Sequence, residues 1–246
     1  MQQDDKMPFT FHLVELRKRL IRSVIAIIVG FGVSYNYSEE LFKILAKPLP
    51  PGTTFSFIRL IEPFFTYMKV SLLTGIFLAS PVLIYEIWAF IAPGLHEKER
   101  KWVWPIVFSS SVLFMGGVIF GYFLVLPFGY SYFLGFATDT IRPMLSMDEY
   151  FSFTTKFLLA FGLVFEMPLF ILFLSLLGIV DAKMLSTYRK YAILAIFIIA
   201  AILTPTPDAF SQILMAAPML VLYEVGIIMA KIFGKKRKAE ETVESA

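Results

Sequence analysis

The stretch FSFTTKFLLAFGLVFEMPLFILFLSLLGIV, residues 151–180, is apolar along nearly its whole length. An apolar run of about 20 residues is long enough to cross the hydrocarbon core of a bilayer as one α-helix. One glutamate, Glu166, lies near the middle of the run. A charged group at that depth costs about 3 kcal/mol on insertion scales, so Glu166 requires an explanation. It is either protonated and hydrogen-bonded among neighbouring helices, or it faces a hydrated groove or a docking partner.

The composition extends the membrane interpretation to the rest of the chain. Of the 246 residues, 58% are hydrophobic and only 17% are charged, and the mean hydropathy is +0.74. A soluble domain of this size could not cover its surface with so few polar side chains. The sequence also lacks the alternating segments of about ten residues that form membrane β-strands. We therefore predict an all-α polytopic membrane protein.

Six apolar runs recur along the sequence, and each is predicted to be a transmembrane helix. Their approximate bounds are 20–37, 64–91, 103–133, 151–180, 191–203 and 209–233. They form one predicted transmembrane domain, residues 1–233, followed by a charged tail, residues 234–246, that is expected to be disordered. The fifth run reaches only about 20 Å as a helix, short of the bilayer core of roughly 30 Å. Its flanking residues complete the span, or the bilayer thins around it, or neighbouring helices shield it.

Lysine and arginine residues are distributed unevenly between the two sets of loops. If the N-terminus is cytoplasmic, the loops on the opposite side hold only Lys43, Lys47, Arg59 and Arg142. Most of the 22 lysine and arginine residues then fall in the cytoplasmic segments. Because cytoplasmic loops are enriched in positive charge, both termini are predicted to be cytoplasmic.

The sequence offers little for catalysis or metal binding. It has no cysteine and two histidines, His12 and His96, each near a glutamate but neither within an HExxH motif. The motifs of serine hydrolases, P-loop proteins and dinucleotide-binding folds are also missing from it. We therefore expect no enzyme activity, no metal, no cofactor and no nucleic-acid partner.

Two clusters of charge mark the predicted cytoplasmic edge. In HLVELRKRL, residues 12–20, leucines recur at helical spacing opposite Glu15 and Arg19, which predicts an interfacial helix leading into the first span. Glu15 and Arg19 are also four residues apart, so a simple ion pair between them is the alternative. In the first cytoplasmic loop, Glu99 and Arg100 belong to a charge run whose alternative interpretation is a solvated surface.

Several motifs together resemble the TatC family, whose members are core subunits of the twin-arginine protein translocase. HLVELRKRL resembles the family's HLxELRxRL, and SPVLIYEIWAFIAPGLHEKER, residues 80–100, resembles its second span and first cytoplasmic loop. FGLVFEMP resembles FGxxFExP, and PDAFSQ, Pro218 and LYE in the sixth run fit the pattern as well. The resemblance extends from about Phe9 to Phe233. One departure is TPTPD in place of the shorter TPPD, which leaves the register of that turn open by one residue.

The resemblance implies a receptor for signal peptides that carry consecutive arginines. By their positions in the motifs, Glu15 and Glu99 would form the acidic site for the arginine pair. A carboxylate can bind a guanidinium through two parallel hydrogen bonds, whereas a lysine offers a compact point charge. The basic residues expected to keep these carboxylates ionised and oriented include Arg17, Arg19 and Arg100. Phe90 and Leu95 are expected to add apolar contact.

The same resemblance implies roles for four further residues. Glu166 and Gln212 would line a polar groove within the membrane, on the concave face of a curved, glove-like bundle that ends in two short spans. Pro48 and Pro93 would be structural. The implied partners are TatA-type and TatB-type single-span subunits, the signal peptides of folded cargo, membrane lipids and further copies of the chain. The implied location is the bacterial cytoplasmic (inner) membrane, with the proton gradient as the source of energy.

Two other functions remain open from the residues alone. A secondary transporter for a small solute would use Glu166 as its proton or cation site. Such transporters usually contain internal repeats, and the first three runs show no convincing similarity to the last three. A scaffold that only assembles other subunits would not contact signal peptides. Export of a folded reporter with an arginine-pair signal, compared with uptake of labelled solutes, distinguishes the translocase from the transporter.

Overall fold

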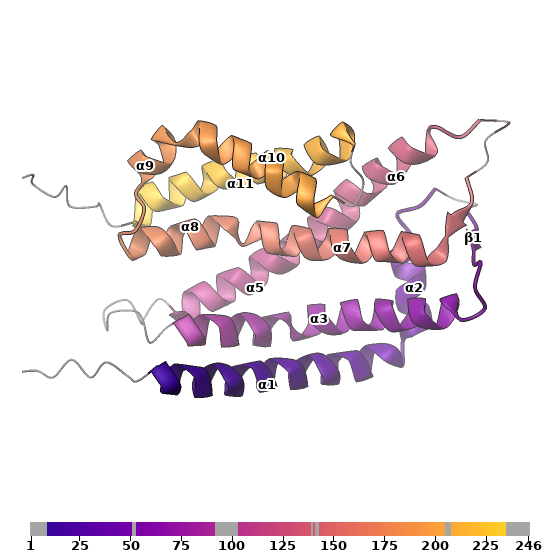
Figure 1. Ribbon diagram of the computed structural model, residues 1–246, viewed down its shortest axis with the longest axis horizontal. Coiled ribbons are helices and arrows are strands. Elements are labelled where there is room, and N and C mark those ends of the chain that lie inside the picture. Colours follow the sequence, from indigo (N-terminus) through magenta and orange to yellow (C-terminus); the bar gives the residue numbers. More distant parts are fainter. Residues whose placement is uncertain are drawn as a thin grey trace, which may run out of the picture. The chain divides into compact units, whose positions relative to one another are not determined.

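The computed structural model describes residues 9–50, 53–91, 103–138, 140, 143–204 and 208–234. Most of these residues lie in helices, as the apolar runs predict (Figure 1). The chain divides into two compact units, residues 1–162 and residues 163–246, and each unit has its own helix packing.

The first unit contains most of the long helices. The bounds of its helices are α1 Phe9–Tyr35, α2 Ser38–Ala46, α3 Glu62–Ile91, α5 Val103–Phe120, η2 Gly121–Val125, α6 Leu126–Leu134 and α7 Met147–Phe165, whose last residues enter the second unit. A two-residue strand β1, Phe55–Ser56, pairs in parallel with β2, Leu145–Ser146. This pairing ties the loop before α3 to the start of α7.

Helices α1 and α3 run side by side (Figure 1). A Cβ added at Gly30 would come within 2.5 Å of the carbonyl oxygen of Gly75, and one added at Gly75 would come within 2.5 Å of the backbone nitrogen of Phe31. Two helix backbones can approach this closely only where side chains are missing. The pair of glycines therefore fixes the crossing of α1 and α3, and with it the positions at which their other side chains meet.

Aromatic side chains dominate the core of the first unit. Phe151 and Phe161 of α7 are fully buried. Phe151 packs against Phe42 of α2, with the ring centroids 4.5 Å apart. The hydroxyl of Tyr150 donates to the carbonyl oxygen of Leu45 at 2.8 Å. Aromatic packing and this hydrogen bond together hold α2 against α7.

The third apolar run is a single long helical segment with an irregular middle. Helix α5 passes into the π-helical turn η2, and α6 follows immediately. Pro127 occupies one of the first positions of α6. Proline lacks an N–H and clashes with the preceding turn, so the chain widens to a π turn just before it.

The second unit consists of shorter helices and one long helix. Their bounds are α8 Met167–Leu176, α9 Ala182–Thr187, α10 Arg189–Leu203 and α11 Ala209–Phe233. Asp181 is the N-cap residue of α9 and accepts a hydrogen bond from the amide of Met184 at 2.6 Å. Asp208 is the N-cap residue of α11 and accepts a hydrogen bond from the amide of Ser211 at 2.7 Å. Each aspartate satisfies an amide that the first helical turn leaves unpaired.

Helices α8 and α11 pack closely within the second unit. A Cβ added at Gly226 of α11 would come within 2.6 Å of the Cδ1 atom of Ile171 in α8. The hydroxyl of Tyr223 donates to the carbonyl oxygen of Leu185 at 2.9 Å. These contacts hold α11 against both α8 and the turn around α9.

Four helical segments are long and apolar enough to cross a membrane within the described part of the chain, and a fifth is counted if α1 and α2 form one bent span. The four are Glu62–Ile91, Trp104–Leu134, Met147–Leu176 and Ala209–Phe233. The chain is therefore a polytopic helical membrane protein. Helix α10 has 15 residues, about 22 Å of helix, which is short for a span, so the number of six spans stays a prediction. The cytoplasmic location of both termini also stays a prediction.

The predicted interfacial helix and first span form one continuous helix, α1. It starts at Phe9 and runs without interruption to Tyr35, where the chain bends by 86° into α2. Charged residues near its start therefore lie on the same rigid element as the apolar run. This arrangement is what brings Glu15 and Arg19 beside α3.

Candidate functional site

The first half of α1 carries an ion pair between Glu15 and Arg19. The Nε and Nη2 atoms of Arg19 donate to Oε1 of Glu15 at 3.1 and 2.6 Å. The two side chains are only 20% and 17% exposed. The i, i+4 pair considered from the sequence is therefore present, and it is largely removed from solvent.

Arg19 also reaches across to α3. Its Nη1 atom donates to Oε2 of Glu86 at 3.0 Å, and Arg22 lies with its Nη1 atom 3.6 Å from Oε1 of the same residue. The side chain of Glu86 is 6% exposed, whereas that of Arg22 is 63% exposed. We call Glu15, Arg19, Arg22 and Glu86 the arginine–glutamate cluster.

The arginine–glutamate cluster is formally neutral, with two carboxylates and two guanidinium groups. A buried carboxylate such as Glu86 is tolerated only when charged or strong hydrogen-bond donors replace its water. Arg19 performs this role for both glutamates, because its planar guanidinium presents several donors in fixed directions. Arg19 is therefore the central member of the cluster, and α1 and α3 supply one carboxylate each.

Several residues of the predicted signal-peptide site fall near this cluster. Arg17 is exposed on α1, away from the contacts that Arg19 makes. Phe90 lies on α3 one helical turn beyond Glu86 and is partly exposed. The remaining predicted members lie outside the described residues, as does Pro93, which was predicted to be structural; these members are Leu95, Glu99 and Arg100.

Glu86 is a member of the cluster that the sequence analysis did not single out. It stands in the apolar stretch LIYEIWAF, where a glutamate has the same unusual character as Glu166. An ionisable residue within a membrane helix is a functional candidate on physical grounds. The same reasoning that selected Glu166 would therefore have found Glu86.

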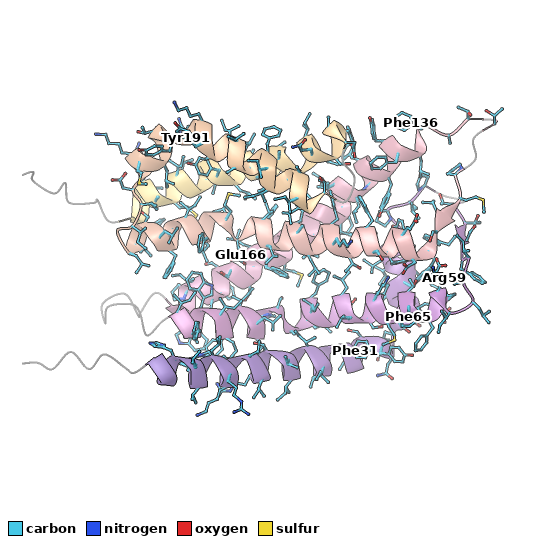
Figure 2. All side chains as sticks on the ribbon, in the orientation of Figure 1. Phe31, Arg59, Phe65, Phe136, Glu166 and Tyr191 are labelled. Carbon is cyan, nitrogen blue, oxygen red and sulfur yellow. The ribbon has the colours of Figure 1, made fainter. Side chains whose placement is uncertain are left out.

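Glu166 lies at the junction of α7 and α8 (Figure 2). It is half-buried, and its amide donates to the carbonyl of Leu163 at 3.1 Å while its carbonyl accepts from the amide of Phe170 at 2.9 Å. Pro168 occupies one of the first positions of α8 and cannot continue the α7 hydrogen-bond ladder. The predicted fourth span is thus two helices that meet at Glu166.

Gln212 and Pro48 each have a clear local setting. The Nε2 atom of Gln212, on α11, donates to the carbonyl oxygen of Phe197 on α10 at 2.9 Å, so this side chain joins two helices. Pro48 lies in the turn after α2, where a proline cannot continue the helix. The groove predicted between Glu166 and Gln212 and the structural role of Pro48 stay predictions.

A second buried carboxylate, Glu62, lies at the start of α3. Its Oε2 atom accepts from the amides of Ile58 and Arg59 at 3.0 and 3.3 Å. Its Oε1 atom accepts from the hydroxyl of Ser146 and the amide of Asp148, both at 3.0 Å. We call this set of four hydrogen bonds the Glu62 network. It joins the loop before α3 to the start of α7, beside the β1–β2 pair.

Next to the Glu62 network, Lys69 of α3 forms an ion pair with Asp148. The ammonium group of Lys69 also donates to the hydroxyl of Ser152 at 3.0 Å. Among the described residues, no group of three or more His, Cys, Asp or Glu side chains is arranged to hold a metal ion.

These features define a class: a helical multi-pass membrane protein with an ionic cluster of carboxylates and guanidinium groups between two packed helices. The chain belongs to the TatC family, because the family described as Sec-independent protein translocase protein (TatC) matches residues 11–218. TatC proteins are membrane components of a translocase and not enzymes, in agreement with the prediction from the sequence.

Individual relatives and solved structures agree with this assignment. The chain is 51% identical to a Sec-independent protein translocase protein TatC of Desulforapulum autotrophicum, over 98% of this chain and 90% of the relative. It is 37% identical to the protein of the same name from Escherichia coli, over 98% and 95% of the two chains. A crystal structure titled as the twin-arginine translocase receptor TatC superimposes with a TM-score of 0.78 at 40% identity, covering 89% of this chain and 97% of that one.

Proposed function

We propose that this chain is the membrane receptor for signal peptides with consecutive arginines, and the core subunit of a translocase that moves folded proteins across the bacterial cytoplasmic membrane. The proposal draws on its membership of the TatC family and on the name of the solved relative, a twin-arginine translocase receptor. The arginine–glutamate cluster is the part of the described structure that fits arginine recognition best.

The observation that carries the proposal is the contact between Glu15 and Arg19. Two nitrogens of one guanidinium group, at 3.1 and 2.6 Å, already bind this carboxylate at a place with limited access to water. A guest arginine can make the same kind of contact, since it carries the same group. A lysine cannot reproduce it with a single ammonium. Glu15 is therefore the centre of the proposed recognition site.

The rest of the proposed site combines Arg17 of α1 and Phe90 of α3 with residues that follow α3 in the sequence. Glu99 would bind the second guest arginine, with Arg100 and Arg17 orienting the carboxylates. Phe90 and Leu95 would cover the apolar part of the peptide. Pro93, between them in the sequence, would have a structural role.

The proposed topology has six spans with both termini in the cytoplasm. Helix α10, with 15 residues, would be a short fifth span, and α11, with 25 residues, would be a sixth span of full length rather than a second short one. The arginine–glutamate cluster would then lie at the cytoplasmic surface of the inner membrane. Signal peptides emerge on that side, because their cargo is made and folded there. The uneven distribution of lysine and arginine between the loops supports this orientation.

Assembly with other subunits completes the proposal. TatA-type and TatB-type single-span proteins and further copies of the chain would be its partners, and the proton gradient would supply the energy. Glu166 and Gln212 would line a polar groove that these subunits or the cargo use within the membrane. The half-buried position of Glu166 at a helix break, and the polar side chain of Gln212 between α10 and α11, support this part.

Binding of a labelled twin-arginine peptide to the purified full chain in detergent tests the proposal. We expect tight binding that is lost when both peptide arginines are changed to lysine, and lost again in Glu15→Ala and Glu99→Ala. The matched control is Glu39→Ala, which breaks an exposed i, i+4 pair with Lys43 on α2. Binding that ignores the lysine change and both substitutions of the proposed site would contradict it.

A further inference from the structure

Arg19 binds its two carboxylate partners, Glu15 and Glu86, with different numbers of hydrogen bonds. Both bonds to Glu15 end on one oxygen, Oε1, and within the described part of the chain Oε2 of Glu15 receives no hydrogen bond or ion pair. The bond to Glu86 uses the remaining terminal nitrogen, Nη1. Arg19 can therefore give up Glu15 without losing its contact with α3.

The two carboxylates also differ in how well they are shielded. The side chain of Glu86 is 6% exposed, and it has a second cation, Arg22, at 3.6 Å. The side chain of Glu15 is 20% exposed, and Arg19 is its one cationic partner among the described residues. A guest from solution therefore reaches Glu15 more easily than Glu86, and Glu86 keeps a positive charge beside it in either case.

Arg19 occupies the place on Glu15 that a guest arginine needs. A guest must displace the Nε and Nη2 atoms of Arg19 before it can bind the carboxylate with two hydrogen bonds of its own. A displaced guanidinium with no other partner would lose a charged contact, which is unfavourable in a site largely shielded from water. With Glu86 in place, the displaced Arg19 has a carboxylate to retain it.

We propose that Glu86 is a positioning residue for arginine recognition: it retains Arg19 when a guest arginine takes over Glu15. This inference rests on the proposed function, because it assumes that the guest binds at Glu15. Arg19 is then a resident competitor rather than a direct ligand of the peptide. In the exchange Arg19 releases Glu15 but keeps Glu86, and the guest guanidinium takes its place on Glu15, so both glutamates stay paired throughout.

The proposal predicts opposite effects for Glu86 and Arg19. In Glu86→Gln, Arg19 has only Glu15 as a carboxylate partner and competes fully for it, so the affinity for the peptide falls about tenfold, the equivalent of one charge-assisted hydrogen bond. In Arg19→Gln the competitor is missing, so the affinity rises several-fold. Without Arg19, Glu86 has nothing to retain, so adding Glu86→Gln to Arg19→Gln changes the affinity less than threefold.

The experiment is a double-mutant cycle on the full chain in detergent. Fluorescence anisotropy of a labelled synthetic twin-arginine peptide gives the Kd for wild type, Glu86→Gln, Arg19→Gln and the double variant. The melting temperature of each variant establishes that it is folded. The double variant keeps the cluster neutral, so it provides a folded reference even where Arg19→Gln alone leaves Glu86 poorly compensated. Glu39→Gln, in the exposed pair on α2, is the control for general effects of removing a carboxylate.

The outcomes separate this inference from the proposed function. A loss below threefold for Glu86→Gln in the wild-type background overturns the inference, and so does a loss of threefold or more in the Arg19→Gln background. If Glu15→Gln abolishes binding in either case, the proposed function stands and only the role of Glu86 is wrong. If wild type does not bind the peptide, or Glu15→Gln binds it as tightly as wild type, both proposals fail.

Discussion

The two ends of helix α3 each bury a glutamate, and the two glutamates are held in different ways. Glu62 at the start accepts from three backbone amides and one hydroxyl of the loops around it. Glu86, about 36 Å further along the helix axis, is bound by the side chains of two arginines. One carboxylate is therefore fixed by the backbone, while the other is held by groups that can move.

The two modes of binding suit the two ends of α3 to different roles. Backbone amides cannot leave a carboxylate without unfolding the loops that carry them, so the Glu62 network is a structural joint. An arginine side chain can exchange one carboxylate for another by rotating about its own bonds. An exchangeable contact suits a receptor for arginine, and the proposed recognition site accordingly lies at the Glu86 end.

We expect the largest loss of stability from Gly75→Ala, which disrupts the close crossing of α1 and α3. The Glu86 end depends on this crossing because Arg19 of α1 binds Glu86, whereas the Glu62 network contains no residue of α1. The added Cβ would meet the backbone nitrogen of Phe31 at 2.5 Å, so the helices must separate. We expect the free energy of unfolding to fall by about 3 kcal/mol, as for strongly overpacked sites. Titration with SDS measures this change, and peptide affinity should fall with it because Arg19 and Glu86 no longer meet.

Gly32→Ala is the matched control for Gly75→Ala. Gly32 lies in α1, the helix that packs against Gly75 of α3, but a Cβ added there meets nothing within 4 Å. Its unfolding free energy should stay unchanged or rise slightly, because alanine favours the helix over glycine. Equal destabilisation by both substitutions would show that the close crossing is not what holds α1 to α3.

Glu62→Gln tests whether the Glu62 network at the start of α3 is a structural joint. The NH₂ group of glutamine replaces one of the two acceptor oxygens, so at least one of the three backbone amides loses its acceptor. We expect the melting temperature to fall by several degrees while the affinity for the peptide is unchanged. Glu149→Gln, an exposed glutamate two residues from the start of α7, is the control. A Glu62→Gln chain that melts like wild type would mean that this network is not a structural joint.

Glu86→Gln should have the smallest effect on stability of the three substitutions. Arg19 keeps Glu15 as its partner and Arg22 is mostly exposed, so neither cation is left buried and uncompensated. The melting temperature should therefore fall less than in Glu62→Gln, measured side by side in the same detergent. A larger fall for Glu86→Gln would contradict the assignment of the structural joint to the Glu62 end of α3.

Much of the helical architecture follows from the apolar runs. Helix α11, Ala209–Phe233, has the bounds of the predicted sixth run because the flanking residues, Asp208 and the basic tail, are strongly polar. The start of α1 differed: the helix begins at Phe9, well before the apolar run. Hydropathy reports contact with lipid, whereas a helix continues until its backbone is broken, and neither glycine nor proline occurs between Phe9 and Val29.

The candidate site was predicted only in part. The ion pair between Glu15 and Arg19 was considered because a spacing of four residues places them on one helix face. Their proposed role in the site came from the resemblance to the TatC family. Glu86 lies 67 residues from Arg19 in the chain, and the contact depends on the glycine crossing, which single-sequence spacing does not reveal. The Glu62 network was missed for a related reason, since most of its donors are backbone amides that carry no signal in the side-chain pattern.

Disulfide cross-linking on the full chain in its native membrane tests directly whether arginine recognition takes place at the arginine–glutamate cluster. The chain has no cysteine, so a disulfide between the chain and the peptide can form only at the introduced residue. A signal peptide with one cysteine beside its arginine pair is offered to His12→Cys, on α1 near Glu15, and to Ile58→Cys, at the Glu62 end. We predict rapid cross-linking at position 12 that the lysine peptide does not give, and none at position 58. Cross-linking at position 58 alone, or equal yields at both positions with either peptide, would contradict recognition at the arginine–glutamate cluster.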